Sequence, residues 1–435
     1  MLAEMRSAAQ RVSAGLDLRA LMADCHRLLS ERGQANSQEI ARGLVERFGA
    51  LPATQQRAFF ERLATQFNPD PVQVLAGAQA YAAKPDAQHL IRLAQLVEPP
   101  RQELLRRINR APGGTASIVH MRRQLLAELP RQPALHALDA DLLHLLSSWF
   151  NPGFLELRRV DWNSPARLLE QLIEHEAVHE IDGWDDLRRR LCDDRRCFAF
   201  FHPQLPGEPL IFVEVALLPA MPTHIGPLID KASPASLPQH FQVAAFYSIS
   251  NCEPGLRGVS LGNFLIKRVA KELQRELPQL KRFCTLSPIP GFGAWLRSKN
   301  PLATLPGLTR VQRERADAAY ALLARSCGDD FTPLSNATTL AGLTPAQQTA
   351  LTRLCAAYFL HGTMTPQGDA VARFHLDNGA RLERINWAAN LSGNGLRQSC
   401  GLMVNYLYDL NKIDDRHEAF TQNEVIASRV VSALL

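Results

Sequence analysis

The chain has 435 residues and a formal net charge of +5, with 46% hydrophobic and 21% charged residues. This length accommodates two or three domains with a substantial core. No block of Lys and Arg with interleaved aromatics argues for nucleic acid, and the most apolar run, Leu210 to Met221, is too short to span a membrane. We therefore expect neither a nucleic-acid partner nor a membrane partner.

The cysteines indicate a reducing compartment. Eight of them are scattered singly along the chain, and no C-x-x-C pair encodes a zinc ribbon or a redox motif. Scattered free thiols suit the cytosol. The N-terminus also lacks the apolar segment of a secretory signal. The sequence therefore predicts a cytoplasmic protein.

Residues 1–150 predict an all-helical domain, because Ala, Leu, Gln, Arg and Glu dominate and β-branched residues are few. Helices are expected to open near Ser37, Ala53 and Asp86, and the last one ends at Asn151-Pro152-Gly153. These elements favour a helical bundle. Since no catalytic constellation occurs there, we expect this domain to form subunit contacts in a homo-oligomer, a dimer or a tetramer.

From residue 151 to 435 the composition predicts a mixed α/β domain, so the fold class is α+β. Two short apolar runs across a Pro/Gly turn form a hairpin, and a third strand leads into a glycine-rich turn, an amphipathic helix and a fourth strand. Further helices and one more strand follow. The expected segments are 197–201 and 210–217 (hairpin), 164–178, 261–277, 309–327, 344–360 and 369–376 (helices), and 241–249, 282–286 and 380–387 (strands).

The glycine-rich turn predicts an anion site. Glycines let the backbone approach a ligand, and the N-terminus of the following helix presents unpaired N–H groups, which suits a phosphate or pyrophosphate. The pattern is neither a Walker A loop nor a dinucleotide fingerprint. It resembles the acyl-CoA loop R-G-x-G-x-G/A-x-x-L of the GNAT acyltransferase superfamily, with Ser260 in place of the middle glycine. The alternative is an ordinary turn capped by Ser260. The candidate substrate-binding residues are Arg257, Gly258, Val259, Ser260, Leu261, Gly262 and Asn263.

Two further residues are candidates for chemistry. His375 stands in Phe374-His375-Leu376-Asp377-Asn378-Gly379, where GNAT enzymes place a tyrosine that acts as an acid, and it could exchange a proton near neutral pH. Ser287 follows a predicted strand and precedes Pro288, so its hydroxyl is held at a strand end. The alternatives are a solvent-facing histidine at a helix end and a turn-forming serine.

Several longer segments resemble the malonyl-CoA decarboxylase family, in the right order over most of residues 150–410. They are Tyr247–Ser250, Gly258–Val269, Leu286–Phe292, Phe374–Ala380, Arg384–Trp387 and Ser399–Tyr406. The order of hairpin, strand, loop, helix and strand is also similar to the GNAT core. The resemblance implies a GNAT-like catalytic domain over residues 151–435 behind the helical domain.

The resemblance further implies that malonyl-CoA is converted to acetyl-CoA and CO2 without a metal or an organic cofactor. It maps the family's catalytic serine, histidine and tyrosine onto Ser287, His375 and Tyr408, and its CoA loop onto Arg257–Asn263. The family usually has Glu where this chain has Ser260, which puts a role for that carboxylate in doubt. On this reading Ser287 orients the malonyl thioester or carboxylate, His375 protonates the enolate, and backbone N–H groups near Ser248–Asn251 stabilise the thioester oxygen.

Other functions stay open at this point. A GNAT-type acyltransferase and a non-catalytic CoA-binding module share the same loop. His175-Glu176-Ala177-Val178-His179 also fits the H-E-x-x-H motif of zinc hydrolases, which needs both histidines on one helical face. Finally, the arginine-rich stretch 188–196 is interpreted as a solvated face, or as a contact for the 3′-phosphate of CoA.

Overall fold

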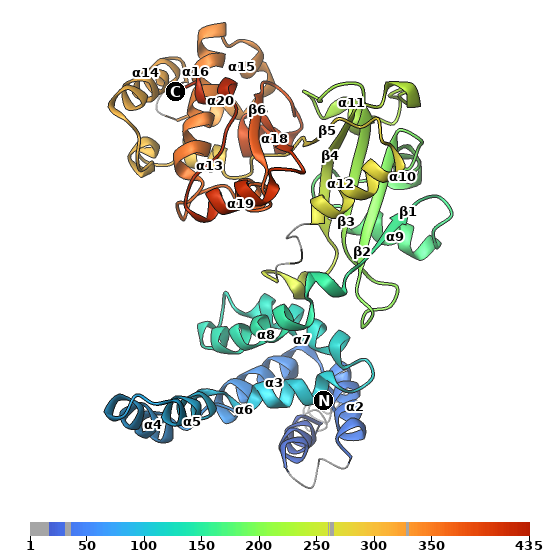
Figure 1. The fold of residues 1–435 in the computed structure, drawn as a ribbon, viewed down its shortest axis with the longest axis vertical. Helices are drawn as coiled ribbons and strands as arrows, with labels where there is room; N and C mark the ends of the chain where they lie inside the picture. Colours follow the sequence, from blue (N-terminus) through green and yellow to red (C-terminus); the bar gives the residue numbers. More distant parts are fainter. Residues whose placement is uncertain (1–16, 31–35, 260, 262–264, 328–329) are drawn as a thin grey trace, which may run out of the picture. The chain divides into compact units, whose positions relative to one another are not determined.

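The computed structural model describes residues 17–30, 36–259, 261, 265–327 and 330–435. It divides into two compact units, which we describe separately (Figure 1). The helical unit comprises Met1–Glu156, Phe201–Glu208 and Glu253–Ser260, and the sheet unit comprises Leu157–Phe200, Pro209–Cys252 and Leu261–Leu435. Two short segments that follow strands of the sheet thus belong to the helical unit.

The helical unit contains residues 17–29 as a first helix, then α2 to α8 and two single 3-10 turns. Asp70 and Asp86 cap α4 and α5 by accepting the N–H groups of Val72 and His89, which explains why these helices begin where they do. The bounds are α2 Ser37–Ala50, α3 Ala53–Gln66, α4 Pro71–Ala83, α5 Ala87–Val97, α6 Pro100–Asn109, α7 Gly114–Glu128, η2 Pro133–Leu135, α8 His136–Trp149 and η3 Pro152–Phe154.

A buried arginine attaches the segment 253–260 to this unit. Arg122 on α7 is 2% exposed and pairs with Asp139 on α8 at 2.8 Å. It also donates to the carbonyl oxygens of Gly255 at 2.9 Å and Arg257 at 2.7 Å. The beginning of the glycine-rich turn is therefore held by a charge-assisted contact with α7.

The sheet unit is built on a seven-stranded sheet, as far as the described residues show, in the order β1-β2-β3-β4-β5-β7-β6. The strands are β1 Glu156–Val160, β2 Arg195–Phe201, β3 Pro209–Leu218, β4 Val243–Asn251, β5 Arg282–Thr285, β6 Arg381–Asn386 and β7 Met403–Tyr408. The helices are α9 Ala166–His175, α10 Gly183–Arg190, α11 Gly226–Ile229, α12 Leu265–Glu276, α13 Phe292–Leu296, α14 Arg310–Cys327, α15 Ala337–Ala341, α16 Pro345–Ala357, α17 Ala370–Asp377, α18 Gly393–Ser399, α19 Ile413–Thr421 and α20 Arg429–Ser432.

Strands β4 and β5 separate partway along their length. They pair in parallel from Val243↔Arg282 to Phe246↔Thr285, and Leu286 N–H donates to the Phe246 oxygen at 3.0 Å. Beyond this point β4 continues beside β3 to Asn251. The chain after β5 instead exchanges hydrogen bonds with β7. We call this separation the β4–β5 fork.

The expected fold class is confirmed. The predicted order of hairpin (β2, β3), strand (β4), turn, helix (α12) and strand (β5) is the observed one. The prediction of a helix over 164–178 was too long, because α9 ends at His175. The strand β7 was not predicted. No helix within the described ranges is long and apolar enough to cross a membrane.

Candidate active site

Ser287 lies at the carboxyl end of β5, beside the fork. Its N–H donates to the Val404 oxygen at 2.8 Å, and the Val404 N–H donates to the Ser287 oxygen at 3.0 Å, so β7 fixes its backbone. The side chain is 5% exposed, and its hydroxyl donates to Thr285 Oγ1 at 2.9 Å. Ser287, two residues beyond the end of β5, thus forms an isolated bridge with Val404 and is not a free turn residue.

His375 lies in the last turn of α17 and reaches Ser287. Asp369 caps this helix by accepting the N–H groups of Val371 and Ala372, and its other oxygen accepts the Gly291 N–H at 2.8 Å. One buried carboxylate therefore joins the helix that carries His375 to the loop that follows Ser287. The distance between His375 Nε2 and Ser287 Oγ is 3.0 Å.

Tyr408 completes a chain of hydrogen bonds. Its hydroxyl lies 2.8 Å from His375 Nδ1, which is its one hydrogen bond among the described residues. A buried phenol must donate its proton, so Nδ1 accepts and Nε2 carries the ring proton. The Nε2–H then donates to Ser287, whose own proton goes to Thr285. The network runs from Tyr408 through His375 and Ser287 to Thr285.

Burial keeps the imidazole neutral. His375 is 4% exposed and stacks on the Tyr406 ring, with centroids 4.6 Å apart. This desolvation lowers the pKa of His375 from its usual 6.5 to about 3. Exchange of a proton by His375 near neutral pH therefore remains a prediction, and it would involve the neutral ring, because the charged form has no water around it. Any proton that it donates must come from the neutral ring.

The glycine-rich turn is described only in part. Gly258 has a φ of +85°, a conformation that suits glycine, and Arg257 and Gly258 are exposed. Val259 and Leu261 are buried, at 9% and 4% exposure. The predicted binding residues Ser260, Gly262 and Asn263 lie outside the described residues.

The H-E-x-x-H segment does not have the geometry of a zinc motif. Helix α9 ends at His175, and Glu176 is extended, so the two histidines do not share a helical face. Glu176 Oε1 instead accepts the N–H groups of Val178 and His179, both at 2.8 Å. Within the described ranges, no group of three or more His, Cys, Asp or Glu side chains is placed to hold a metal ion.

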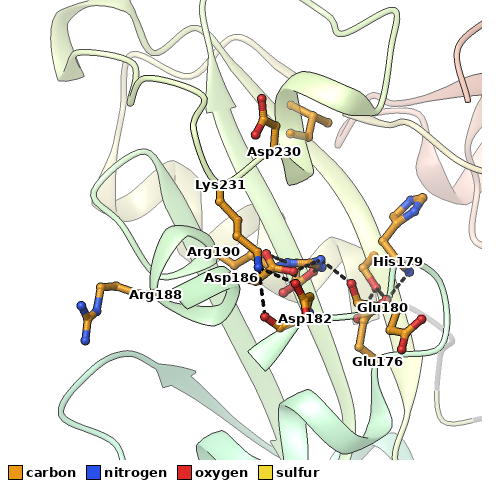
Figure 2. A network of polar contacts seen from close by, with 12 residues as sticks. Glu176, His179, Glu180, Asp182, Asp186, Arg188, Arg190, Asp230 and Lys231 are labelled. Atoms are coloured by element: carbon orange, nitrogen blue, oxygen red, sulfur yellow. Dashed lines mark hydrogen bonds and ion pairs between the residues drawn. The ribbon is translucent and has the colours of Figure 1, made fainter. Parts of the chain in front are cut away.

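This segment is fastened by a buried arginine (Figure 2). Arg190 on α10 is 1% exposed, forms two hydrogen bonds with Asp186 at 2.9 and 3.1 Å, and pairs with Glu214 on β3 at 3.0 Å. It also donates to the backbone carbonyl oxygen of Glu180 at 3.0 Å. Arg190 therefore joins α10, β3 and the loop after α9.

The interpretation of the arginine-rich stretch as a solvated face was wrong for three of its members. Arg189, Arg190 and Arg195 are buried, and two of them pair with Asp194, at 2.8 Å for Arg189 and 2.7 Å for Arg195. Arg188 is the exposed member of the run. The carboxylates are what permit burial of these guanidinium groups.

Sequence reasoning missed Thr285 and Tyr406, and it considered Glu176 only as part of the H-E-x-x-H motif. Thr285 Oγ1 accepts a hydrogen bond from the Ser287 hydroxyl and a second one, at 3.2 Å, from the Tyr406 N–H. The Glu176 carboxylate accepts hydrogen bonds from the hydroxyl groups of Ser248 and Ser250 on β4. A signal was present: polar residues alternate in Thr285-x-Ser287 and in Ser248-x-Ser250 within otherwise apolar strands, which places each pair on one face of the sheet.

Family models match both parts of the chain. The malonyl-CoA decarboxylase C-terminal domain matches residues 153–435, and the malonyl-CoA decarboxylase N-terminal domain matches residues 67–150. The chain therefore belongs to the malonyl-CoA decarboxylase family, as the sequence resemblance indicated.

Individual relatives agree with this assignment. The mitochondrial malonyl-CoA decarboxylase of Mus musculus is 38% identical over 416 residues, which are 88% of this chain and 82% of the mouse protein. A crystal structure of malonyl-CoA decarboxylase from Rhodopseudomonas palustris is similar with a TM-score of 0.81 and 43% identity, covering 96% of this chain and 99% of that one. The enzyme from Agrobacterium vitis has a TM-score of 0.80 and 43% identity, covering 95% and 99%.

Proposed function

We propose that this protein decarboxylates malonyl-CoA to acetyl-CoA and CO2. The observation that carries the proposal is the buried chain Tyr408–His375–Ser287, which directs an N–H donor toward the fork of the sheet in a member of this family. Decarboxylation breaks a C–C bond and leaves an enolate, so a site for this reaction needs a donor for the enolate carbon. It needs no metal or organic cofactor for this step.

The direction of the hydrogen bonds suits His375 as that donor. When CO2 leaves, its bonding electrons form the thioester enolate, whose carbon is far more basic than an imidazole nitrogen. The proton on His375 Nε2 can pass to this carbon, while the Tyr408 proton moves to Nδ1 and keeps the ring neutral. Solvent then reprotonates Nε2, and the Nδ1 proton returns to the Tyr408 oxygen, which restores both the phenol and the resting tautomer of the ring. The products leave as CO2 and acetyl-CoA, and one proton has been consumed.

Ser287 takes the positioning role in this proposal. Its hydroxyl sits between His375 and Thr285, so it can turn from Thr285 to the substrate without losing the Nε2–H bond. That bond orients it toward the malonyl thioester or carboxylate. Formation of an acyl-serine would require the opposite hydrogen-bond direction, with the Ser287 hydroxyl donating to His375. Decarboxylation also needs no acyl transfer. Residues Arg257–Asn263 would hold the CoA diphosphate.

Two alanine variants test the proposal. Ser287→Ala and His375→Ala should each lower kcat for CO2 release by about 10²- to 10⁴-fold, since they remove the positioning or the proton transfer. The dissociation constant for CoA should change by less than about threefold, because neither residue lies in the glycine-rich turn. Release of CO2 is measured from purified protein with malonyl-CoA, and acetyl-CoA is identified by mass.

Different outcomes would separate other functions. Near-normal activity in both variants would contradict the assigned roles. Appearance of free thiol, detected with a thiol-reactive dye, would indicate an acyltransferase, because decarboxylation leaves the thioester intact. Binding of CoA without CO2 release would indicate a non-catalytic binding module.

We also propose that residues 1–150 mediate homo-oligomer assembly, while residues 151–435 carry the reaction. The support comes from α4 and α5, whose large apolar side chains are exposed: Val72 by 74%, Leu75 by 59%, Leu90 by 49%, Ile91 by 59% and Val97 by 47%. No residue of α5 is buried. A helix pair with such a face fits a second copy of itself in a four-helix arrangement.

A cytoplasmic location is proposed from the eight free cysteines.

A further inference from the structure

Thr285 forms the end of the buried hydrogen-bond network that contains Ser287 and His375. Its side chain is 1% exposed, and its Oγ1 accepts the Ser287 hydroxyl at 2.9 Å and the Tyr406 N–H at 3.2 Å. A hydroxyl oxygen has two acceptor positions, and these two donors occupy both of them. Since a backbone N–H can only donate, Thr285 meets Ser287 as an acceptor at this end of the network.

The sheet fixes the position of this acceptor. Thr285 pairs with Phe246 on β4, and its carbonyl oxygen accepts the amide N–H of Asn405 at 2.7 Å. Asn405 is itself 0% exposed, and its amide oxygen accepts the Asn386 amide at 2.8 Å. A fixed backbone and the few rotamers of a β-branched side chain leave Oγ1 little freedom to move away from Ser287.

The network could run in either of two directions. In the observed one, Tyr408 donates to His375 Nδ1, Nε2–H donates to Ser287, and Ser287 donates to Thr285, so each of these three protons has an acceptor. In the reverse one, Ser287 would donate to Nε2 and Nδ1–H to the Tyr408 oxygen. The Tyr408 proton would then have no acceptor among the described residues. The extra hydrogen bond favours the observed direction by about tenfold or more.

We propose that Thr285 is a positioning residue: by accepting the Ser287 proton it holds the Ser287–His375 pair in the direction in which the ring donates. Its catalytic consequence rests on the decarboxylation proposed above. The ring proton stays on Nε2, where it is available to the enolate carbon. When substrate binds, the Ser287 proton can turn to a substrate oxygen and the direction is kept. Without Thr285, the serine proton would turn to Nε2, the direction that activates a serine for attack.

Thr285→Val tests this directly, since it removes the acceptor and keeps the branched shape of the side chain. The two directions then have equal numbers of hydrogen bonds, because one leaves the Ser287 proton free and the other the Tyr408 proton. The Nδ1–H tautomer of His375 should rise from a minor species to about half of the molecules. Nitrogen-15 NMR of histidine-labelled protein in neutral buffer measures this, with the signal assigned by its loss from His375→Gln.

Activity should follow the tautomer. In Thr285→Val, kcat for CO2 release should fall by about two- to tenfold, because fewer molecules carry the proton on Nε2 and the Ser287 hydroxyl is less well oriented. KM for malonyl-CoA should stay within about twofold, since the change acts on the proton and not on CoA binding. Thr285→Ser keeps the acceptor, so it should retain both the Nε2–H tautomer and kcat within about twofold of the wild type.

Thr363→Val is the matched control. This threonine is also 1% exposed, and its hydroxyl donates to the Phe359 carbonyl oxygen at 2.6 Å, outside the network. The substitution and the loss of one buried hydrogen bond are therefore the same. The His375 tautomer, kcat and KM should all stay at wild-type values.

An unchanged His375 tautomer in Thr285→Val would overturn the inference, and so would a loss of kcat that Thr285→Ser shares. If Thr285→Val fails to fold, Tyr408→Phe decides. Thr285 still takes the Ser287 proton in that variant, so the ring proton should stay on Nε2, and a dominant Nδ1–H form would show that Tyr408 alone sets the direction. If the wild type releases no CO2 from malonyl-CoA, the proposed function fails, whereas the tautomer measurement needs no substrate and still decides the role of Thr285.

Discussion

At the scale of single residues, the site depends on an uncharged histidine. An imidazolium at position 375 would be a stronger acid, but burial against Tyr406 excludes the water that would stabilise its charge. A neutral ring is sufficient because an enolate carbon is a strong base. It also does not attract the malonyl carboxylate so strongly that loss of CO2 is opposed. In the proposed mechanism, burial of His375 therefore keeps the resting ring uncharged and leaves its proton to be donated after CO2 has left.

This neutrality predicts a specific pH behaviour. An unfolded histidine titrates near 6.5, whereas His375 has a pKa of about 3, so between these values the unfolded chain binds one more proton than the native protein. Its contribution to stability is complete above pH 6.5 and is lost as the pH falls toward 3, by about 1.4 kcal/mol per pH unit. The histidine NMR signal that is absent from His375→Gln should not shift between pH 8 and 5. A midpoint near 6.5 would contradict the burial argument.

Local patterns made Ser287 a candidate, but only the resemblance connected it with His375 and Tyr408, since 88 residues separate Ser287 from His375. Local patterns carry no information on such a contact. Glu176 was misinterpreted for the opposite reason: a strong local motif was present, but the carboxylate bonds its own following backbone and the serines of β4. The motif alone does not show which groups the Glu176 carboxylate contacts in the folded protein.

At the scale of elements, periodicity and capping predicted most helices and strands. Asp369 caps α17, and Asn378-Gly379 follows its end, as expected. The predictions failed where tertiary contacts determine where a helix ends or whether a side chain is buried. The helix after Pro165 stops at His175 because Glu176 takes up the next free N–H groups itself. Three arginines of the arginine-rich stretch are buried because they pair with Asp186, Asp194 and Glu214, and the last of these lies on β3, 24 residues from Arg190.

Arg190 gives a prediction at this scale. Arg190→Met leaves Asp186 and Glu214 buried without their shared cation, and it frees the loop that carries Glu176. The free energy of unfolding should fall by about 3–5 kcal/mol. Arg188→Met is the matched control, because the Arg188 guanidinium is exposed and stacks on Trp162 at 5.2 Å; the change should cost about 1 kcal/mol or less. Chemical denaturation compares the two. Equal losses would show that the buried network does not contribute as argued.

At the scale of the whole molecule, two connections matter. The segments 201–208 and 253–260 follow strands of the sheet, yet they group with the helices, and Arg122 binds the second of them. Composition places a boundary near residue 150 but cannot assign these later segments, since the second contacts α7 and the first contacts Phe150 and Phe154 through His202. The helical unit thus supports the first residues of the glycine-rich turn, besides its proposed part in assembly.

Assembly through α4 and α5 gives the last prediction. Gly77 lets the two helices pack closely against each other, since a Cβ there would lie 2.7 Å from Leu96 Cδ1, and their apolar residues are left outward. Covering one such side chain contributes about 1.5–3 kcal/mol, and a symmetric interface uses each twice. Ile91→Lys should therefore weaken self-association by about a hundredfold or more, toward the 48.3 kDa monomer in sedimentation velocity. Val311→Lys, at an equally exposed apolar residue of α14 (54%), should leave the mass unchanged. If Ile91→Lys keeps the wild-type mass, or if both variants dissociate alike, then α4 and α5 are not the interface.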